Sequence, residues 1–279
     1  MEICNKIICG DNTEILKTIP YNYIDLVVTS PPYQNLRTYN GYSFDFENTA
    51  KELYRTLKIG GVICWIVGDS VVDGSETLDP LRQALYFKEI CGFRVLDTMI
   101  YQKNGQALPD KTRYGQCWEY MFILSKGKPK TINLLRDKKN RWAGVSNFGA
   151  NTIRQKDGTL TEIKKCCPPE FGIRYNIWKY ATGFGYTTKD KIAFEHPAIF
   201  PESLAGDAIL SWSNPGDLVL DPFNGSGTTC LMAKKLRRNY IGIDISEEYC
   251  TLARTRIKNS DNREDFIKEN SKEKMKKFL

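Results

Sequence analysis

A turn with two glycines, placed late in the chain between an apolar run and a helical segment, constrains the fold more than any other feature. The apolar run covers residues 217–220 and is typical of a buried strand. The turn contains Gly225 and Gly227, and residues 228–236 fit a helix. Strand, glycine turn and helix form the half of a doubly wound α/β sheet that binds nucleoside cofactors, because glycine lets the backbone come close to the ligand.

An acidic residue completes this pattern. A second short apolar run at 240–243 ends in Asp244, where an acid about 20 residues beyond the glycine turn is placed to bind ribose hydroxyls. Position 230 holds a cysteine, so the third glycine of the dinucleotide fingerprint is missing. The sequence therefore favours a smaller adenosyl ligand over NAD or FAD.

A proline pair follows another apolar run near the N-terminus. The run at 24–28 is typical of a buried parallel strand, and it is followed by Thr29, Ser30, Pro31, Pro32 and Tyr33. Ligands of open parallel sheets bind at the carboxyl ends of the strands. The prolines stiffen the backbone and supply carbonyls without a competing N–H. A hydroxyl, carbonyls and an aromatic ring suit a flat group that bears an amino group, whereas the simpler alternative is a turn that only ends the strand.

Together, the motifs TSPPY at 29–33 and DPFNGSGTT at 221–229 resemble the catalytic and cofactor motifs of S-adenosylmethionine-dependent DNA amino-methyltransferases. Their order, with the catalytic motif first, resembles the β class of that family. The segment around Asp11 resembles the family's N-terminal acidic loop, and His196 with Pro197 resembles its segment before the cofactor motif. The resemblance covers about residues 1–126 and 192–258, and the middle of the chain departs from it, as in a family whose target-recognition region varies.

This resemblance implies an α/β fold with a doubly wound, mostly parallel, seven-stranded Rossmann-like methyltransferase sheet in circularly permuted order. The implied regions are a catalytic half at 1–126, a basic target-recognition insert at 127–191, a cofactor-binding half at 192–258 and a charged tail at 259–279. Permutation changes the order of the strands along the chain, but the strand ends at Ser30 and Gly225 still meet in one cleft.

The resemblance also implies site residues. Catalysis is assigned to Ser30, Pro31, Pro32 and Tyr33. Binding of S-adenosylmethionine is assigned to Asp11, Asp221, Phe223, Gly225, Gly227, Thr228 and Asp244. Asp221 and Phe223 suit the cationic side of this cofactor through charge pairing and cation–π contact.

The chemistry of an exocyclic amino group explains the catalytic turn. Its nitrogen is a poor nucleophile until it pyramidalises, and acceptors for its two protons favour that change. Ser30 Oγ and a carbonyl of the proline pair suit this role, Tyr33 can stack on the base, and the base must rotate out of the duplex to reach them. Ser-Pro-Pro-Tyr resembles the members that methylate N4 of cytosine, whereas those that methylate N6 of adenine mostly carry Asp or Asn at the position of Ser30. Adenine N6 is the alternative target.

Apolar periodicity predicts further elements. Helices are predicted at 47–58, 79–91 and 201–212, and a strand at 62–67. Gly60 and Gly61 are expected to stop the first helix. Strands at 93–102 and 119–125 are expected to form a hairpin at the edge of the sheet.

The middle segment carries most of the positive charge. Residues 126–194 hold fifteen Lys or Arg and five acids, a net charge of +10 against +7 for the whole chain. These bases are interleaved with polar and aromatic residues, which favours a surface that binds nucleic acid over a merely solvated face. The resemblance implies that this nucleic acid is double-stranded DNA. Candidate DNA-binding residues are Arg136, Lys138, Lys139, Arg141 and Arg154.

Cysteine and histidine usage excludes other classes. None of the nine cysteines follows a proline, which excludes the nucleophile of cytosine ring-carbon methyltransferases. Most lie in apolar segments, among them Cys9, Cys64 and Cys91, and are predicted to be small core residues of a reduced, cytoplasmic protein. His196 is the only histidine, so we assign no metal ligand. No apolar run is long enough to cross a membrane, and residues 1–6 do not resemble a signal peptide.

The resemblance further implies the modification half of a restriction–modification system, with a restriction endonuclease as partner. The sequence leaves open a monomer or a homodimer. Methylation of RNA or of a protein glutamine is an alternative activity, but in such enzymes the cofactor motif usually precedes the catalytic one. An alternative of another class is a non-catalytic DNA-binding protein with the same fold.

Overall fold

The computed structural model describes residues 3–32, 45–105, 112–145, 152–162 and 167–260. Tyr33 of the predicted catalytic turn and nearly all of the predicted tail lie outside the described residues. The described residues fall into two compact units. The larger comprises those up to Asn133 and from Asn176 onward, and the smaller lies within Leu134–Tyr175.

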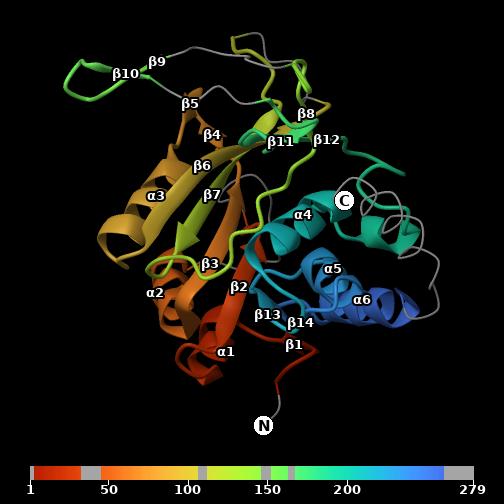
Figure 1. Cartoon of the computed structure of the whole chain (residues 1–279). Coiled ribbons are helices and arrows are strands. Elements are labelled where there is room, and N and C mark those ends of the chain that lie inside the picture. The colour runs from red at the N-terminus through yellow and green to blue at the C-terminus, as the bar shows by residue number, and fades with distance from the viewer. Residues whose placement is uncertain (1–2, 33–44, 106–111, 146–151, 163–166, 261–279) are drawn as a thin grey trace. The chain divides into compact units, whose positions relative to one another are not determined.

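One eight-stranded sheet runs through the larger unit (Figure 1). From edge to edge its strands are β1 (Lys6–Cys9), β14 (Asn239–Asp244), β13 (Leu218–Asp221), β2 (Ile24–Thr29), β3 (Leu57–Val67), β7 (Trp118–Ser125), β6 (Arg94–Lys103) and β12 (Ile177–Tyr180). All neighbours are parallel except β7, which is antiparallel to β3 and to β6. The sheet is therefore mostly parallel, as predicted.

The strand order confirms the circular permutation. Strands β13 and β14, from the last quarter of the chain, lie between β1 and β2, from its first thirty residues. The C-terminal part of the chain thus supplies central strands of the sheet. Residues 26–28 of β2 and 63–66 of β3 are fully buried, because strands with helices on both faces need apolar side chains on both faces.

The expectation of seven strands was wrong by one. Strand β12, from the segment predicted as an insert, pairs in parallel with β6, and its Trp178 stacks on Trp212 with ring centroids 5.9 Å apart. The predicted hairpin of β6 and β7 is confirmed, but its predicted place at the sheet edge is wrong. Strand β12 covers the outer edge of β6, whose backbone groups would otherwise be open to pairing with another chain.

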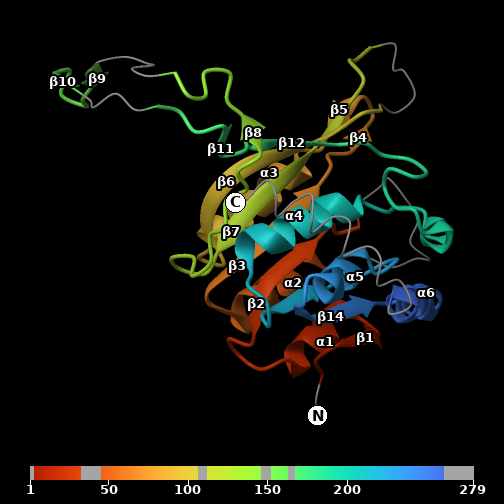
Figure 2. The same ribbon diagram turned by 45° about the vertical axis from the view of Figure 1, so that its right-hand side comes forward.

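Helices cover both faces of the sheet (Figures 1 and 2). One face carries α1 (Asn12–Thr18), α2 (Phe46–Thr56) and α3 (Asp79–Glu89), and the other carries α4 (Glu202–Trp212), α5 (Thr228–Lys235) and α6 (Glu247–Asn259). A short 3-10 helix, η1 (Lys191–Glu195), precedes α4. Ile63 and Trp65 of β3 pack with Leu53 of α2 and Phe87 of α3 in one apolar core, since alternate strand residues point to the same face.

Two glycines act differently from the expectation. Helix α2 ends at Thr56, and β3 begins at Leu57 and continues through Gly60 and Gly61, so these glycines do not stop the helix. They instead let β3 lie close to neighbouring segments. Gly60 has a φ of +84°, and a Cβ on Gly61 would lie 2.9 Å from the carbonyl oxygen of Asp25. The other predicted helices at 79–91 and 201–212 are confirmed to within two residues.

Short two-stranded sheets complete the structure. Strands β4 (Val71–Val72) and β5 (Ser75–Glu76) form a hairpin in the larger unit. The smaller unit contains the pairs β8 (Lys138–Lys139) with β11 (Phe171–Gly172) and β9 (Thr152–Arg154) with β10 (Leu160–Glu162). Among the residues described, no helix has the length and apolar character needed to cross a membrane.

Candidate active site

Hydrogen bonds tie together two strand ends that lie far apart in the sequence. The Thr29 hydroxyl, at the end of β2, donates to Asp221 Oδ1, at the end of β13, over 2.6 Å. Thr229 Oγ1, in the first turn of α5, donates to the carbonyl oxygen of Val28 over 3.1 Å. Both bonds are buried. They fix the carboxyl ends of neighbouring parallel strands, which is the edge where α/β sheets bind ligands.

A cavity of about 1100 Å³ lies at this edge of the sheet. Phe223, Gly225, Thr228 and Asp244 line the wall formed by the turn after β13 and the end of β14, which is the predicted cofactor end. Ser30, Pro31 and Pro32 line the predicted catalytic end, together with Lys103 and Glu119 from the ends of β6 and β7. Ser30 and Gly225 therefore line one cavity, as the permuted order predicted.

The two glycines of the turn have different structural reasons. Gly225 has a φ of +47°, and a Cβ there would lie 2.9 Å from His196 Nε2. Gly227 has a φ of +79°, and a Cβ there would lie 2.7 Å from the Cβ of Ala253 in α6. Only Gly225 lines the cavity. Gly225 thus lets the turn lie close to His196, which also lines the cavity, whereas Gly227 lets α5 begin close against α6.

Asp244 closes the cofactor end. One carboxylate oxygen accepts the N–H of Gly225 over 2.7 Å, and the other accepts the N–H of Ser246 over 2.9 Å. Each oxygen keeps a further lone pair that can accept a hydroxyl proton, so the carboxylate suits a vicinal diol such as ribose. Burial raises the pKa of Asp244, and the two backbone hydrogen bonds oppose this rise.

Asp221 lies beneath the cavity rather than in its wall. Its side chain is 1% exposed, and it accepts the Thr29 hydroxyl and the N–H of Phe223. Burial raises the pKa of Asp221 to about 6, while hydrogen bonds from Thr29 and Thr229 act in the opposite direction. Its carboxylate holds the strand end and the turn together. Direct contact between Asp221 and a cofactor stays a prediction.

The N-terminal loop also differs in detail from its predicted role. Asp11 caps α1 by accepting the N–H of Glu14 over 3.0 Å, and it does not line the cavity. The next residue, Asn12, does line it. Sequence reasoning selected the charged residue of this loop, and the helix cap turns that charge away from the wall.

Arg256 is a supporting residue that sequence reasoning missed. It is 1% exposed and donates from Nη1 to the carbonyl oxygen of Ser226 over 2.6 Å, behind the glycine turn. It also pairs with Asp190 and Glu202 at 3.1 and 3.2 Å. A guanidinium can hold several such partners in one plane, so Arg256 joins α6, the glycine turn and the segment before α4. An arginine in a helical pattern gave no sign of this burial.

The catalytic end holds charged groups that were not predicted. Glu119 is 8% exposed and pairs with Lys103, and Arg113 and Trp118 also line this end. Asp69 is 8% exposed and accepts the N–H of Ser70 and the hydroxyl of Thr77, so it shapes the turn after β3. Cations and an acceptor beside Ser30 make this end suitable for a polar, hydrogen-bonding ring.

The predicted DNA-binding residues lie in the smaller unit. They are Arg136, Lys138, Lys139, Arg141 and Arg154. All but the half-buried Lys138 are exposed. Lys138 Nζ lies 4.4 Å from the ring centre of Tyr175, and the Arg141 guanidinium lies 5.3 Å from that of Trp142. Cations held beside aromatic rings are a chemistry used to bind nucleic acid.

The residues at the cofactor end fit an adenosyl ligand. Gly225 and Phe223 line the same wall, and the Asp244 carboxylate can accept from a diol. Asn224 also lines the cavity, but its buried Oδ1, for which no hydrogen-bond partner is found in the described part of the chain, lies against Gly242 of β14. Adjacent to this end, Ser30 and the proline carbonyls offer acceptors for an amino group. The arrangement can therefore hold a cofactor and an amino-bearing ring side by side.

Comparisons with known proteins agree with this geometry. A family model described as DNA methylase matches residues 24–255. The orphan methyltransferase M.BamHII of Bacillus amyloliquefaciens is 59% identical over 237 residues, which cover 85% of this chain and 89% of that protein. Other relatives, 26–31% identical, are named type II methyltransferases.

Solved structures show the same fold. The PvuII DNA methyltransferase, titled cytosine-N4-specific, has a TM-score of 0.64 at 20% identity and covers 92% of this chain and 91% of its own. The complex of M1.HpyAVI with SAM has a TM-score of 0.58 at 24% identity and covers 90% of this chain and 98% of its own.

Proposed function

The chain belongs to the DNA methylase family, and on that premise we propose that it transfers a methyl group from S-adenosylmethionine to N4 of cytosine in duplex DNA. The observation that carries the proposal is the single cavity lined by Ser30 at one end and by Gly225 and Asp244 at the other. S-adenosylmethionine supplies the methyl group on a sulfonium, which makes the methyl carbon electrophilic.

The chain's own residues position and activate the acceptor nitrogen. Ser30 Oγ and a proline carbonyl accept the two amino protons, which favours the pyramidal nitrogen that attacks the methyl carbon. At the cofactor end, Asp244 would accept hydrogen bonds from the ribose hydroxyls, and Phe223 would supply an aromatic ring for the cationic group. Both ends belong to one rigid strand edge, so catalysis is mainly positioning. The base enters the cavity after it rotates out of the duplex.

Cytosine N4 is favoured over adenine N6 by the hydroxyl of Ser30. A serine is neutral and adds no negative charge beside N3 of cytosine, which is itself an acceptor. Lys103 and Arg113 line the same end and can donate to ring acceptors, but both bases carry such acceptors, so these donors do not separate cytosine from adenine. Family membership alone does not separate the two bases, since the DNA adenine methyltransferase YhdJ of Escherichia coli is also a relative, 28% identical.

Nucleoside mass spectrometry of DNA methylated by the purified chain tests this proposal. We expect N4-methylcytosine, which differs in mass from N6-methyladenine. The variant Ser30→Ala should lower the methylation rate about five- to tenfold, because one neutral hydrogen bond is worth about 1 kcal/mol. Its cofactor affinity should match that of the unchanged chain. N6-methyladenine as the sole product would refute the cytosine assignment and leave amino-methylation in place.

The affinity for S-adenosylmethionine should depend on pH through Asp221. Its pKa of about 6 means that the carboxyl group is mostly neutral below this pH and charged above it. A negative charge beneath the cavity attracts the cationic cofactor, so the affinity should rise as the pH increases through about 6 and then level off. Calorimetric titrations between pH 5 and pH 8 measure this rise.

The variant Asp221→Asn is the control for this prediction. It keeps the size of the side chain and removes the titration. Asp244 also has a raised pKa, so any dependence left in the variant belongs to Asp244. An unchanged pH profile in Asp221→Asn would contradict the role of Asp221.

We propose that the smaller unit binds DNA through its exposed basic residues. Reversing the charge of Lys138, Lys139 and Arg141 should weaken DNA binding and flatten its dependence on salt, because each phosphate contact releases counterions. The log–log slope of affinity against salt concentration measures this, with cofactor affinity as the internal control. The same reversal at Lys17, Lys51 and Arg82, which are exposed on α1, α2 and α3, is a matched control and should leave the slope unchanged. If the variant at Lys138, Lys139 and Arg141 has the same slope as the unchanged chain, these residues only form a solvated face.

A restriction endonuclease is a proposed partner. Relatives named type II methyltransferases support a restriction–modification context. The relative with 59% identity is named an orphan methyltransferase, which supports action without such a partner. The methyl-transfer proposal is the same in both contexts, because it rests on residues within this chain.

A further inference from the structure

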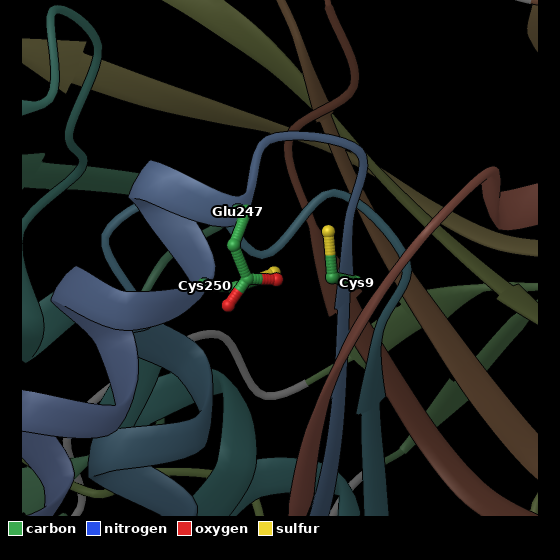
Figure 3. A group of neighbouring side chains, drawn as sticks. All are labelled: Cys9, Glu247 and Cys250. Carbon is green, nitrogen blue, oxygen red and sulfur yellow. The ribbon is translucent and has the colours of Figure 1, made fainter.

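Three potential metal ligands converge at the end of β1. They are the Sγ atoms of Cys9 and Cys250 and a carboxylate oxygen of Glu247, and all three atoms lie within 4.8 Å of one another. Figure 3 shows the Glu247 and Cys250 side chains projecting from the start of α6 towards Cys9 on the neighbouring strand. Cys9 and Glu247 are exposed, whereas Cys250 is buried. None of the three lines the cavity of the active site.

The backbone holds this cluster in place. Cys9 lies opposite Asp244 in the parallel pair β1–β14, and the N–H of Gly10 donates to the carbonyl oxygen of Asp244 over 2.9 Å. Ser246 caps α6, which starts at Glu247, shortly after the end of β14. Glu247 and Cys250 are three residues apart, so their side chains lie on one face of the helix. The convergence is thus fixed by a strand end and a helix start.

The cluster is electrically neutral before a cation binds. Glu247 is paired with Arg254 at 2.6 Å, and hydrogen bonds from Cys9 and Arg254 lower the pKa of its carboxyl group. Partial loss of solvation and the neighbouring Glu247 carboxylate raise the pKa of Cys9, and burial raises the pKa of Cys250 to about 12. Without a cation, the cluster holds one carboxylate, two neutral thiols and one guanidinium.

We propose that Cys9, Glu247 and Cys250 form a binding site for one thiophilic divalent cation of the zinc and cadmium class. Sulfur ligands select such soft or borderline ions, and cation binding drives the thiols to lose their protons. Two thiolates, one carboxylate, the Arg254 guanidinium and a divalent cation then sum to zero charge. The exposure of Cys9 and Glu247 leaves a fourth, tetrahedral position for water.

The same thiols are poorly suited to act as a redox pair. The thiolate is the species that attacks a disulfide or a peroxide, and both cysteines favour the neutral thiol. The two thiols lose their protons only when a cation binds them. Cys9 was also predicted to be a core residue, and that prediction is wrong because its side chain lies at the open end of β1, exposed to solvent.

Titration of the reduced full chain with cadmium tests the proposal. In a buffer with a phosphine reductant and no free metal, the unchanged chain should show a thiolate-to-cadmium absorption band that saturates at one ion per chain. Cys9→Ala and Cys250→Ala should lose this band, and Glu247→Gln should weaken the affinity roughly 10-fold or more. Zinc should compete for the same site, and its binding should raise the melting temperature of the unchanged chain.

Cys166 and Cys167, which are adjacent in the sequence, provide the matched control. The double variant C166A/C167A removes two thiols elsewhere in the chain and should keep the cadmium band and its stoichiometry. Circular dichroism checks that each variant is folded. The proposal is refuted if the reduced chain binds no cadmium, or if Cys9→Ala and Cys250→Ala bind it as the unchanged chain does. Formation of a disulfide between Cys9 and Cys250, without cadmium binding, would also refute the proposal.

Discussion

Replacing Arg256 by methionine is expected to lower the free energy of unfolding by about 3 kcal/mol. The guanidinium is buried and satisfies Asp190, Glu202 and the carbonyl oxygen of Ser226. Removing one partner from a buried ion pair typically costs about 3–5 kcal/mol, because the remaining charges stay desolvated. We expect the lower end of this range, since Lys235 also pairs with Glu202 at 3.1 Å.

Urea unfolding of the unchanged chain and of Arg256→Met measures this loss of unfolding free energy. The matched control is Arg254→Met, two residues earlier on α6, where the side chain is 44% exposed and pairs with Glu247. Exposed pairs contribute about 0–1 kcal/mol, so this variant should unfold close to the unchanged chain. Equal urea midpoints for Arg256→Met and Arg254→Met would show that Arg256 does not stabilise the glycine turn. Arg256→Lys keeps the charge but cannot reach the same partners, and it should fall between them.

Replacing Asp244 by alanine is expected to weaken the binding of S-adenosylmethionine by about 1–3 kcal/mol. The variant loses the carboxylate that we propose accepts from ribose hydroxyls. It also loses the acceptor for the N–H of Gly225 and of Ser246, so the glycine turn itself is less fixed. Both effects act in the same direction. Isothermal titration calorimetry of the purified chain measures the change.

The control for this prediction is Asp217→Ala. Asp217 precedes β13, at the opposite end of that strand, and its carboxylate accepts the N–H of Asn214 over 2.6 Å. It thus anchors a turn as Asp244 does, but outside the cavity, and its loss should leave the affinity unchanged. No measurable binding by the unchanged chain would overturn the cofactor assignment. Equal affinities of the unchanged chain and Asp244→Ala would overturn only the role of Asp244.

Local patterns predicted most of the elements around the site. The runs at 24–28, 217–220 and 240–243 are strands, and the glycine turn is followed by a helix, because buried parallel strands are continuously apolar and a turn with φ > 0 needs glycine. The predicted cofactor residues Phe223, Gly225 and Asp244 line one cavity with Ser30, because the carboxyl ends of parallel strands meet at one edge of the sheet.

Contacts between distant segments could not be predicted in the same way. Strand β12 was missed because four residues in a basic segment carry little periodicity, and only the open edge of β6 and the ring of Trp212 make them a strand. Arg256 was missed because its partners lie in three other segments. Asp221 and Asp11 were selected for their charge, but their positions in a buried network and a helix cap depend on the packing around them.

Apolar runs and the geometry of glycine and proline were enough to predict the buried strands and the turns after them. The permuted order of the sheet and the methyl-transfer role of the site came from the resemblance of two motifs, and of their order, to a known family. The tertiary structure alone decided which charges face the cavity, which are buried as supports, and that Cys9 meets Glu247 and Cys250 across more than two hundred residues. Hydrogen bonds, ion pairs and metal ligands act over a few ångströms. Their partners are therefore set by how strands and helices pack, which spacing along the chain does not encode.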